Sequence, residues 1–449
     1  MLDKVTSEKT NSWSTNELHV FERLESDVQS YARNFPAVFS RAVGAEIWDV
    51  NGNRYLDFLA GAGSLNYGHN HPAMKAALVD YILDDQIGNS LDLHTDAKQK
   101  FLVALDDIVL KPRDLDYVVQ FTGPTGTNAV EAALKVARKV TGRTNVVAFT
   151  NGFHGVTSAA LAATGNSGHR GGSGMPLTGV SRMPYEGYLG PDVDTIDYLE
   201  KMITDPSSGL DLPAAVLVET VQGEGGHRAA SANWLRRLET VCRDHDILLI
   251  VDEIQAGCGR TGTFFSFEPS GIKPDIVTLS KSISGFGLPL ALVLIRPDLD
   301  IWKPGEHNGT FRGNNHAFVT ATSALETYWK TRTFEKQLKA KSAVVAERLS
   351  SMQDRHSTQI ISVPGRGMMR GLEFADPNEA GKVAKLAFEK GLIAERVGPR
   401  DEVVKCMTPI NIDNAHLNEG LDILEQSIGE TLGSKKCANY SVKSIRPNA

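Results

Sequence analysis

Six short β-rich runs between about residues 75 and 325 constrain the fold of this 449-residue chain more than any other feature. They cover 117–121, 145–149, 214–219, 247–252, 275–280 and 290–295. Helical patterns separate several of them, as in 128–140, where apolar residues recur at i, i+3, i+4 and i+7. Strands that alternate with helices predict βαβ units and a mostly parallel sheet. Such a sheet binds its ligand beyond the carboxyl ends of its strands.

The flanking segments predict further elements. A helical pattern covers 21–31, and Asn51-Gly52 between alternating apolar residues predicts a β-hairpin. After Thr331 we expect a long helix, a strand within 365–374 and a final helix near 416–432. The prediction is therefore an α/β fold with four parts. These are an N-terminal segment (1–75) that joins the small domain, a large domain (76–325) with a mostly parallel sheet of seven-stranded type, a small α+β domain (326–433) and a disordered tail (434–449).

Composition excludes several classes of protein. Lys and Arg number 47 against 54 Asp and Glu, and the net charge of −7 gives no general attraction to nucleic acid. The four cysteines are scattered, which argues against a disulfide framework and against a metal site. The apolar runs are too short for a membrane span, and the polar N-terminus lacks a signal-peptide core. We expect a cytoplasmic enzyme with neither nucleic-acid nor membrane partners.

The segment 121–138 predicts an anion site. A strand ends there, a Gly-rich turn follows, and a helix begins at about Thr127. Backbone N–H groups at a helix start attract phosphate. The segment lacks the Gly-Lys-Ser/Thr of a nucleoside-triphosphate loop, and alone it also fits an ordinary helix N-cap.

Two further strand ends carry charged residues. Asp252 ends an apolar strand, and a buried carboxylate needs a cationic partner. Lys281 follows the next β-rich run, 29 residues later. A lysine desolvated there has a lowered pKa and forms a Schiff base with an aldehyde, although a single Lys at a strand end is more often a surface residue. Together with the anion site, these residues indicate pyridoxal 5′-phosphate (PLP), an electron sink that needs a partner for its pyridinium nitrogen.

The combination Asp-Glu-x-Gln, Gly-x-Gly-Arg-Thr-Gly and the later lysine resembles the class III (ω-) aminotransferases over about residues 20–430. These are PLP-dependent enzymes of fold type I, the aspartate-aminotransferase-like fold. The resemblance implies that Lys281 holds the cofactor and shuttles a proton, while Asp252 pairs with the pyridine nitrogen. It further implies cofactor contacts by Gly126 and Thr127 (phosphate), Phe153 and Ile254 (ring faces), Gln255 (ring hydroxyl) and Thr310 (phosphate of a neighbouring subunit). A homodimer, or a higher homo-oligomer, follows from the last contact.

The segments 120–135, 218–226 and 300–315 are similar to one subgroup of this family. That subgroup transfers the amino group of L-glutamate to the terminal aldehyde of L-aspartate 4-semialdehyde, in a ping-pong reaction of an ectoine-type pathway. The products are L-2,4-diaminobutyrate and 2-oxoglutarate, so the expected partners are small amino acids, aldehydes and keto acids. The alternatives are another ω-aminotransferase (for ornithine, acetylornithine, 4-aminobutyrate or a specialised-metabolite aldehyde), an aminomutase, or a non-catalytic PLP-binding paralogue.

The resemblance also implies two substrate residues. Glu224 matches a gating glutamate that pairs with an arginine in one half-reaction and releases it to bind 2-oxoglutarate in the other. Here Lys405 stands where that arginine is expected. Because lysine is a point charge without a bidentate fork, the two cations are not equivalent.

Overall fold

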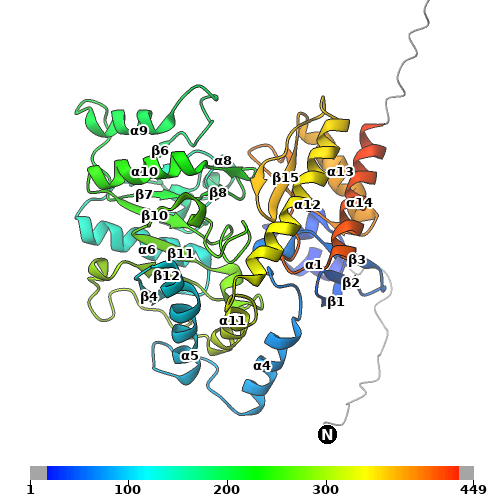
Figure 1. Cartoon of the computed structure of the whole chain (residues 1–449), viewed down its shortest axis with the longest axis horizontal. Helices are drawn as coiled ribbons and strands as arrows, with labels where there is room; N and C mark the ends of the chain where they lie inside the picture. The colour runs from blue at the N-terminus through cyan, green and yellow to red at the C-terminus, as the bar shows by residue number, and fades with distance from the viewer. Residues whose placement is uncertain (1–17, 434–449) are drawn as a thin grey trace, which may run out of the picture.

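A seven-stranded sheet forms the centre of the computed structural model, which describes residues 18–433 (Figure 1). Its strands, in spatial order, are β4 (Val118–Phe121), β12 (Leu292–Ile295), β11 (Ile276–Leu279), β10 (Leu248–Asp252), β7 (Ala215–Val218), β5 (Val146–Phe149) and β6 (Val180–Met183). Only β12 runs against its neighbours, and the other six strands are parallel to one another. The predicted mostly parallel sheet is confirmed, and β6 is the strand that the sequence patterns did not reveal.

Two helices on opposite faces bury this sheet. In β10, Ile250 belongs to the apolar cluster of α6 (Gly126–Thr141), whereas Leu249 and Val251 belong to the cluster that contains α10 (Ala232–Asp244). Consecutive side chains of a strand point to opposite faces, so a strand covered on both sides must be apolar throughout. Each such buried side chain contributes about 1.5–3 kcal/mol. In β10 the only polar residue, Asp252, is therefore the last one of the strand.

The N-terminal segment forms its own sheet with a strand from the C-terminal part. It contains α1 (His19–Leu24), α2 (Tyr31–Asn34), β1 (Phe39–Val43), β2 (Glu46–Asp49) and β3 (Arg54–Asp57). The predicted hairpin is confirmed, because β2 and β3 are antiparallel around Gly52, which has the positive φ that the turn requires. The prediction of a continuous helix over 21–31 is wrong, since the chain forms two short helices separated by residues 25–30. Pairing of β3 with β16 (Leu392–Ile393) supports the expected association with the small domain.

The C-terminal part packs helices against a second sheet. It consists of α12 (Thr333–Arg355), β13 (Ile360–Ser362), β14 (Gly365–Arg366), β15 (Met369–Phe374), α13 (Pro377–Glu389), β17 (Arg396–Val397), β18 (Val403–Cys406) and α14 (Asn414–Leu432). The predicted long helix, strand and final helix are all present.

The remaining elements connect these layers. They are α3 (Ala60–Gly63), α4 (Pro72–Leu83), α5 (Asp96–Ala104), α7 (Ser158–Ala163), α8 (Ser167–Gly171), α9 (Thr195–Thr204), β8 (Val221–Gln222), β9 (Arg228–Ala229) and α11 (Asn315–Tyr328), together with short π and 3-10 turns at 105–113, 268–270, 281–284 and 297–299. No helix within residues 18–433 is long and apolar enough to cross a membrane. The predicted tail, 434–449, lies outside the described residues.

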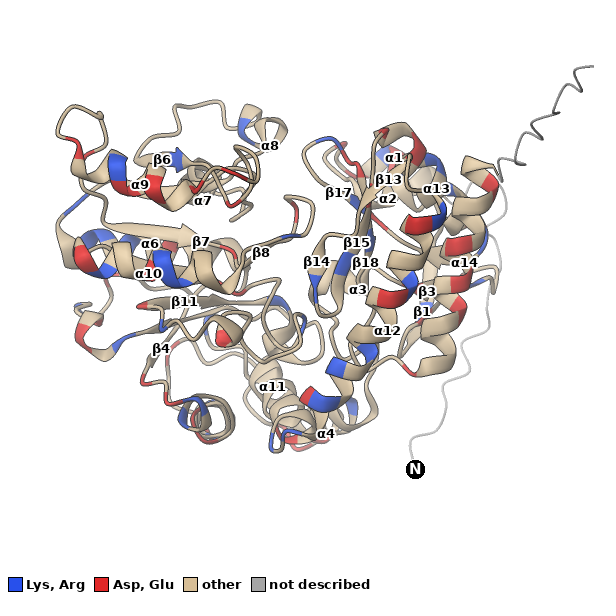
Figure 2. Ribbon diagram, turned by 45° about the horizontal axis from the view of Figure 1, so that its top comes forward, with Lys and Arg blue, Asp and Glu red and all other residues tan. Residues whose placement is uncertain are grey.

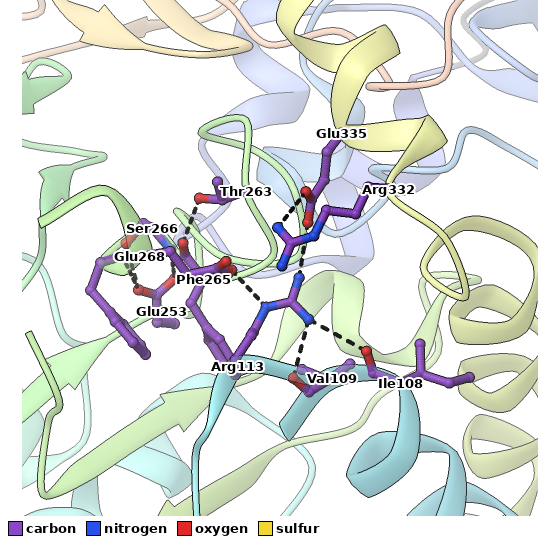
Figure 3. A network of polar contacts seen from close by, with 11 residues as sticks. Ile108, Val109, Arg113, Glu253, Thr263, Phe265, Ser266, Glu268, Arg332 and Glu335 are labelled. Carbon is purple, nitrogen blue, oxygen red and sulfur yellow. Dashed lines mark hydrogen bonds and ion pairs between the residues drawn. The ribbon is translucent and has the colours of Figure 1, made fainter. Parts of the chain in front are cut away.

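One buried arginine joins three segments that are distant in sequence (Figure 3). Arg113, with 7% of its side chain exposed, donates from Nε to Glu268 (2.9 Å) and from Nη2 to Glu335 (3.0 Å). It also binds the carbonyl of Val109 at 3.1 Å. Glu268 directly follows the loop 253–267, which connects to the end of β10. Glu335 lies in the first turn of α12. The arginine therefore fixes that loop against the C-terminal part.

We expect Arg113→Met to lower the free energy of unfolding by about 3 kcal/mol, because it leaves the largely buried Glu268 without its cation and Glu335 with only the exposed Arg332. Arg332→Met is the matched control, since Arg332 also pairs with Glu335 but has 65% of its side chain exposed. Its effect should stay below about 1 kcal/mol. Thermal unfolding midpoints of the two variants test this, and equal midpoints would contradict the role given to Arg113.

Candidate active site

A cavity of about 170 Å³ lies at the carboxyl ends of the parallel strands. It is lined by Gly126, Thr127, Phe153, His154, Gly155, Glu219, Glu224, Asp252, Ile254, Gln255 and Lys281. We call it the inner cavity. The structure thus brings together all the predicted site residues except Lys405 and Thr310. No cluster of three or more His, Cys, Asp or Glu side chains suited to a metal ion occurs within residues 18–433.

Lys281 is the nucleophile candidate in the inner cavity. It lies two residues beyond Leu279, the end of β11, and its backbone has a φ of +52°, a conformation that costs a non-glycine residue roughly 1–3 kcal/mol. Burial lowers the pKa of Lys281, and the charge of Lys405 lowers it further, against the opposing effect of nearby carboxylates. The side chain forms no hydrogen bond with any described residue. A lowered pKa increases the fraction of neutral amine, which is the nucleophilic form.

Asp252 is a buried carboxylate that also lines the inner cavity. It is the last residue of β10. Its Oδ1 accepts from Thr278 Oγ1 and from the backbone N–H of Ile254, both at 3.1 Å, and its Oδ2 accepts from His154 Nδ1 at 2.8 Å. Burial alone would lower the pKa of His154, but the hydrogen bond and the charge of Asp252 outweigh it and raise that pKa. The pair therefore favours a positive imidazolium beside an aspartate carboxylate.

The sequence analysis missed two residues of this site, Glu219 and the partner role of His154. Glu219 follows β7 and accepts the backbone N–H groups of Phe153 (3.0 Å) and Gly223 (3.2 Å). Burial raises the pKa of Glu219 to about 7. The sequence does mark Glu219 as a candidate, because it comes directly after a buried strand, just as Asp252 comes at the end of one.

The start of α6 forms an anion site. Gly126 and Thr127 are its first residues, and N–H groups in a first helical turn have no intrahelical acceptor. A Cβ on Gly126 would lie 3.1 Å from Ile254, and one on Gly155 would lie 2.4 Å from Thr127 Oγ1. Only glycine permits this close packing around the helix start, which favours a bound phosphate.

Gln255 offers a hydrogen-bond acceptor that no described residue uses. Its Nε2 donates to the carbonyl of Ala62 (3.1 Å) and to Glu224 (3.2 Å). Its Oε1 is buried and has no partner within residues 18–433. A buried acceptor without a partner costs about 1–3 kcal/mol, so a hydroxyl group of a ligand would stabilise it. The residues present therefore fit PLP, which brings a phosphate, a ring nitrogen and a ring hydroxyl.

A larger, outer cavity of about 690 Å³ is lined by Lys281 and by residues of both α8 and β17. Figure 2 labels these two elements, α8 in the part of the chain that contains the seven-stranded sheet and β17 in the C-terminal part. The outer cavity shares Phe153, Glu224 and Lys281 with the inner cavity. Tyr31, Glu395, Arg396 and Asp401 line its other side. Substrates can therefore approach Lys281 past charged groups from the C-terminal part.

Lys405 is fully buried behind the outer cavity. Its Nζ donates to Glu395 at 2.7 Å and to Glu224 at 3.3 Å, and we call these three residues the carboxylate–lysine cluster. Burial lowers the pKa of Lys405, but the two carboxylates raise it well above its usual value. Burial raises the pKa of Glu224, but Lys405 and Lys281 lower it to about 2. All the charges of the Glu224–Lys405 pair are therefore retained at neutral pH.

Thr310 lies apart from this site. It is exposed, in the loop between residues 299 and 315, and lines neither cavity of its own chain.

The fold and the site together define the class of this protein. A parallel sheet ends at one cavity that holds a lysine of lowered pKa, a buried aspartate and a helix-start anion site, and these are the groups that PLP requires. The class is that of PLP-dependent enzymes of fold type I, as the comparisons with known proteins also show.

The family model for class III aminotransferases matches residues 28–428. A diaminobutyrate--2-oxoglutarate transaminase of Vibrio parahaemolyticus is 59% identical over 418 residues, which cover 93% of this chain and 99% of that protein. The proteins of the same name from Bordetella parapertussis (52%, covering 95% and 98%) and Halalkalibacterium halodurans (55%, covering 94% and 99%) are also similar. The chain belongs to the class III aminotransferase family.

Solved structures agree with this fold. The ornithine aminotransferase of Toxoplasma gondii is 27% identical, with a TM-score of 0.80 over 92% of this chain and 94% of that one. A second structure of that enzyme is described with partial occupancy of PLP at its active site. An S-selective transaminase from Arthrobacter sp., 22% identical with a TM-score of 0.82 over 92% and 98% of the two chains, shows the fold alone. PLP is the cofactor of this family.

The raised pKa of Glu219 predicts a pH-dependent stability. Its pKa is about 7 when folded and near 4.5 when unfolded, so the folded state holds a proton that the unfolded state has lost between these values. Wild-type stability therefore falls as the pH rises through this window, whereas Glu219→Gln does not titrate. Both proteins are compared after removal of the cofactor. The thermal midpoint of Glu219→Gln minus that of wild type should increase as the pH is raised from 5 to 8. Glu347→Gln, at an exposed position on α12, is the control. A difference between Glu219→Gln and wild type that stays constant with pH would refute the assignment.

Proposed function

We propose that this enzyme transfers the amino group of L-glutamate to the terminal aldehyde of L-aspartate 4-semialdehyde, giving L-2,4-diaminobutyrate and 2-oxoglutarate. The observation that carries transamination is the inner cavity, in which Lys281, Asp252 and the start of α6 converge. The choice of substrates is supported by the names of relatives that are 52–59% identical over nearly their whole length. The reaction would supply diaminobutyrate to an ectoine-type pathway.

Different residues of the inner cavity would bind different groups of PLP. The N–H groups at Gly126 and Thr127 would hold the phosphate, and Asp252 would pair with the pyridine nitrogen. A charge-assisted hydrogen bond of this kind contributes about 1.5–3 kcal/mol. Phe153 and Ile254 would cover the two ring faces, and the free Oε1 of Gln255 would accept from the ring hydroxyl.

Lys281 performs the proton transfer. PLP, when bound, supplies an electron sink for the electrons of the substrate C–H bond that is broken. Lys281 Nζ takes up the proton from the substrate carbon and delivers it again at the end of the half-reaction. Its lowered pKa suits this task, because a base whose pKa lies closer to neutrality both accepts and returns a proton readily.

Glu224 and Lys405 would let one site hold two different substrates. Glutamate reacts at its α-amino group and presents a distal carboxylate, whereas diaminobutyrate reacts at its terminal amine. Glu224 is the more exposed carboxylate partner of Lys405 and contacts it at the longer distance. We infer that Glu224 moves aside for the distal carboxylate of glutamate or 2-oxoglutarate, which then pairs with Lys405.

The active unit is proposed to be a homodimer. The exposed position of Thr310, outside its own cavities, supports a contact with the phosphate in a neighbouring subunit. Large apolar side chains are also exposed on α4, on α5 and in the segment between them, namely Val79, Ile82, Leu83, Ile87, Leu91, Leu93 and Val103. Such a surface is typical of an interface. A cytoplasmic location is supported by the free cysteines Cys242, Cys258 and Cys406.

Lys281→Ala should lower turnover by about 10²–10⁴-fold or more, because the base and cofactor link are both lost. Some PLP should still bind through the phosphate site. Lys273→Ala is the matched control, since Lys273 is a solvent-exposed lysine that pairs with Asp114. Steady-state rates and the absorbance of the bound cofactor measure both effects, and near-normal activity in Lys281→Ala would disprove its role.

A donor scan tests the proposed substrates. The change in cofactor absorbance is followed by stopped flow with equal concentrations of L-2,4-diaminobutyrate, L-ornithine, 4-aminobutyrate and L-glutamate. Diaminobutyrate and glutamate should react fastest, since they are the amino donors of the two half-reactions. If ornithine or 4-aminobutyrate reacts faster than diaminobutyrate, the proposed substrate is wrong while the family and cofactor stand.

A further inference from the structure

Glu395 is a charged residue of the outer cavity that the proposed reaction has not used. Its Oε2 accepts from Lys405 Nζ at 2.7 Å, and its backbone carbonyl accepts the N–H of Lys405 at 2.8 Å. Only 10% of the Glu395 side chain is exposed, yet it lines the outer cavity together with Tyr31 and Lys281. Two contacts therefore fix Glu395 to Lys405, while its carboxylate still borders the space where a substrate lies.

The carboxylate–lysine cluster has more negative than positive charge. Two carboxylates share one ammonium group, so the net charge is −1 when all three are ionised. Burial, the largest effect, and the charge of Glu224 raise the pKa of Glu395 above its usual value, even though Lys405 lowers it. The charge of Lys281 acts in the opposite direction. A cation that a ligand places between Lys281 and Glu395 would be stabilised in the same way.

Diaminobutyrate carries such a cation. When its terminal amine reacts at Lys281, its α-ammonium group remains at the other end of a short chain. Building on the proposed function, we propose that Glu395 binds this α-ammonium group and thereby selects amino donors that carry a second ammonium group. Glutamate has no second ammonium group, so Glu395 offers it no comparable contact.

The test compares two donors in the PLP-loaded enzyme. 4-Aminobutyrate is diaminobutyrate without the α-ammonium group, so the ratio of their second-order rate constants for cofactor conversion isolates that group. Glu395→Gln keeps an acceptor for Lys405 but removes the charge. We expect this ratio to fall by about 10–100-fold, through slower reaction of diaminobutyrate, because a hydrogen bond to a charged partner is lost. The rate constant for 4-aminobutyrate should change much less than that for diaminobutyrate.

Asp401→Asn is the matched control. Asp401 lines the same cavity, but 62% of its side chain is exposed and it does not contact Lys405. The ratio of the rate constants for diaminobutyrate and 4-aminobutyrate in Asp401→Asn should equal that of wild type. Because the ratio is taken within one variant, the fraction of folded enzyme does not affect it.

Three results would overturn the proposal. If Glu395→Gln slows both donors equally, Glu395 only positions Lys405 and does not read the α-ammonium group. If wild type reacts with diaminobutyrate and neither rate constant changes in Glu395→Gln, Glu395 has no part in selection and the proposed function survives. A wild-type enzyme that converts another amine but not diaminobutyrate would overturn both the proposed function and this role.

Discussion

The common direction of β4, β5, β7, β10 and β11 is the constraint on which the site depends. These strands end at one edge of the sheet, and the segment after each contributes to the inner cavity. The register fixes depth as well as direction, since Asp252 pairs with Thr278 in the ladder and accepts a hydrogen bond from its side chain. A slip by one residue would turn every apolar side chain of β10 to the opposite face. Lys281, three residues beyond Thr278, would then lose its placement relative to Asp252.

Buried charges around the cavity are paired or neutralised, with one exception. Asp252 has His154, and Glu219 has a pKa of about 7, so it carries its full charge only above neutrality. Lys405 has two carboxylates. Lys281, by contrast, forms no hydrogen bond within the described chain and is held in a strained backbone conformation. A reactive amine that is bound by no other side chain can approach a ligand without first breaking a contact, which suits the chemistry better than a stable ion pair would.

Much of this arrangement could be predicted where a residue and its environment are adjacent in sequence. Asp252 and Lys281 lie at or just beyond the ends of apolar strands. The apolar runs therefore indicate which residues lie at the carboxyl edge of the sheet. The role of Glu395 was not predictable in this way, because it depends on the pairing of β17 with β18 and on a backbone contact to Lys405. The strand β6 was missed for a related reason. It is an edge strand, half-buried over three of its four residues, so its sequence lacks the apolar run that marks the central strands.

The pairing of Lys405 with two carboxylates would let a lysine serve in the proposed gate. Removing the partner of a buried ion costs about 3–5 kcal/mol, so a gate with a single glutamate must exchange one carboxylate for another without leaving its cation alone. Here Glu395 remains bonded to Lys405 whichever way Glu224 moves. An ammonium group has three N–H donors, and Glu224 and Glu395 occupy two of them. When Glu224 leaves, Lys405 keeps one charge partner and regains a donor for the substrate carboxylate. A second fixed carboxylate thus substitutes for the bidentate fork that lysine lacks.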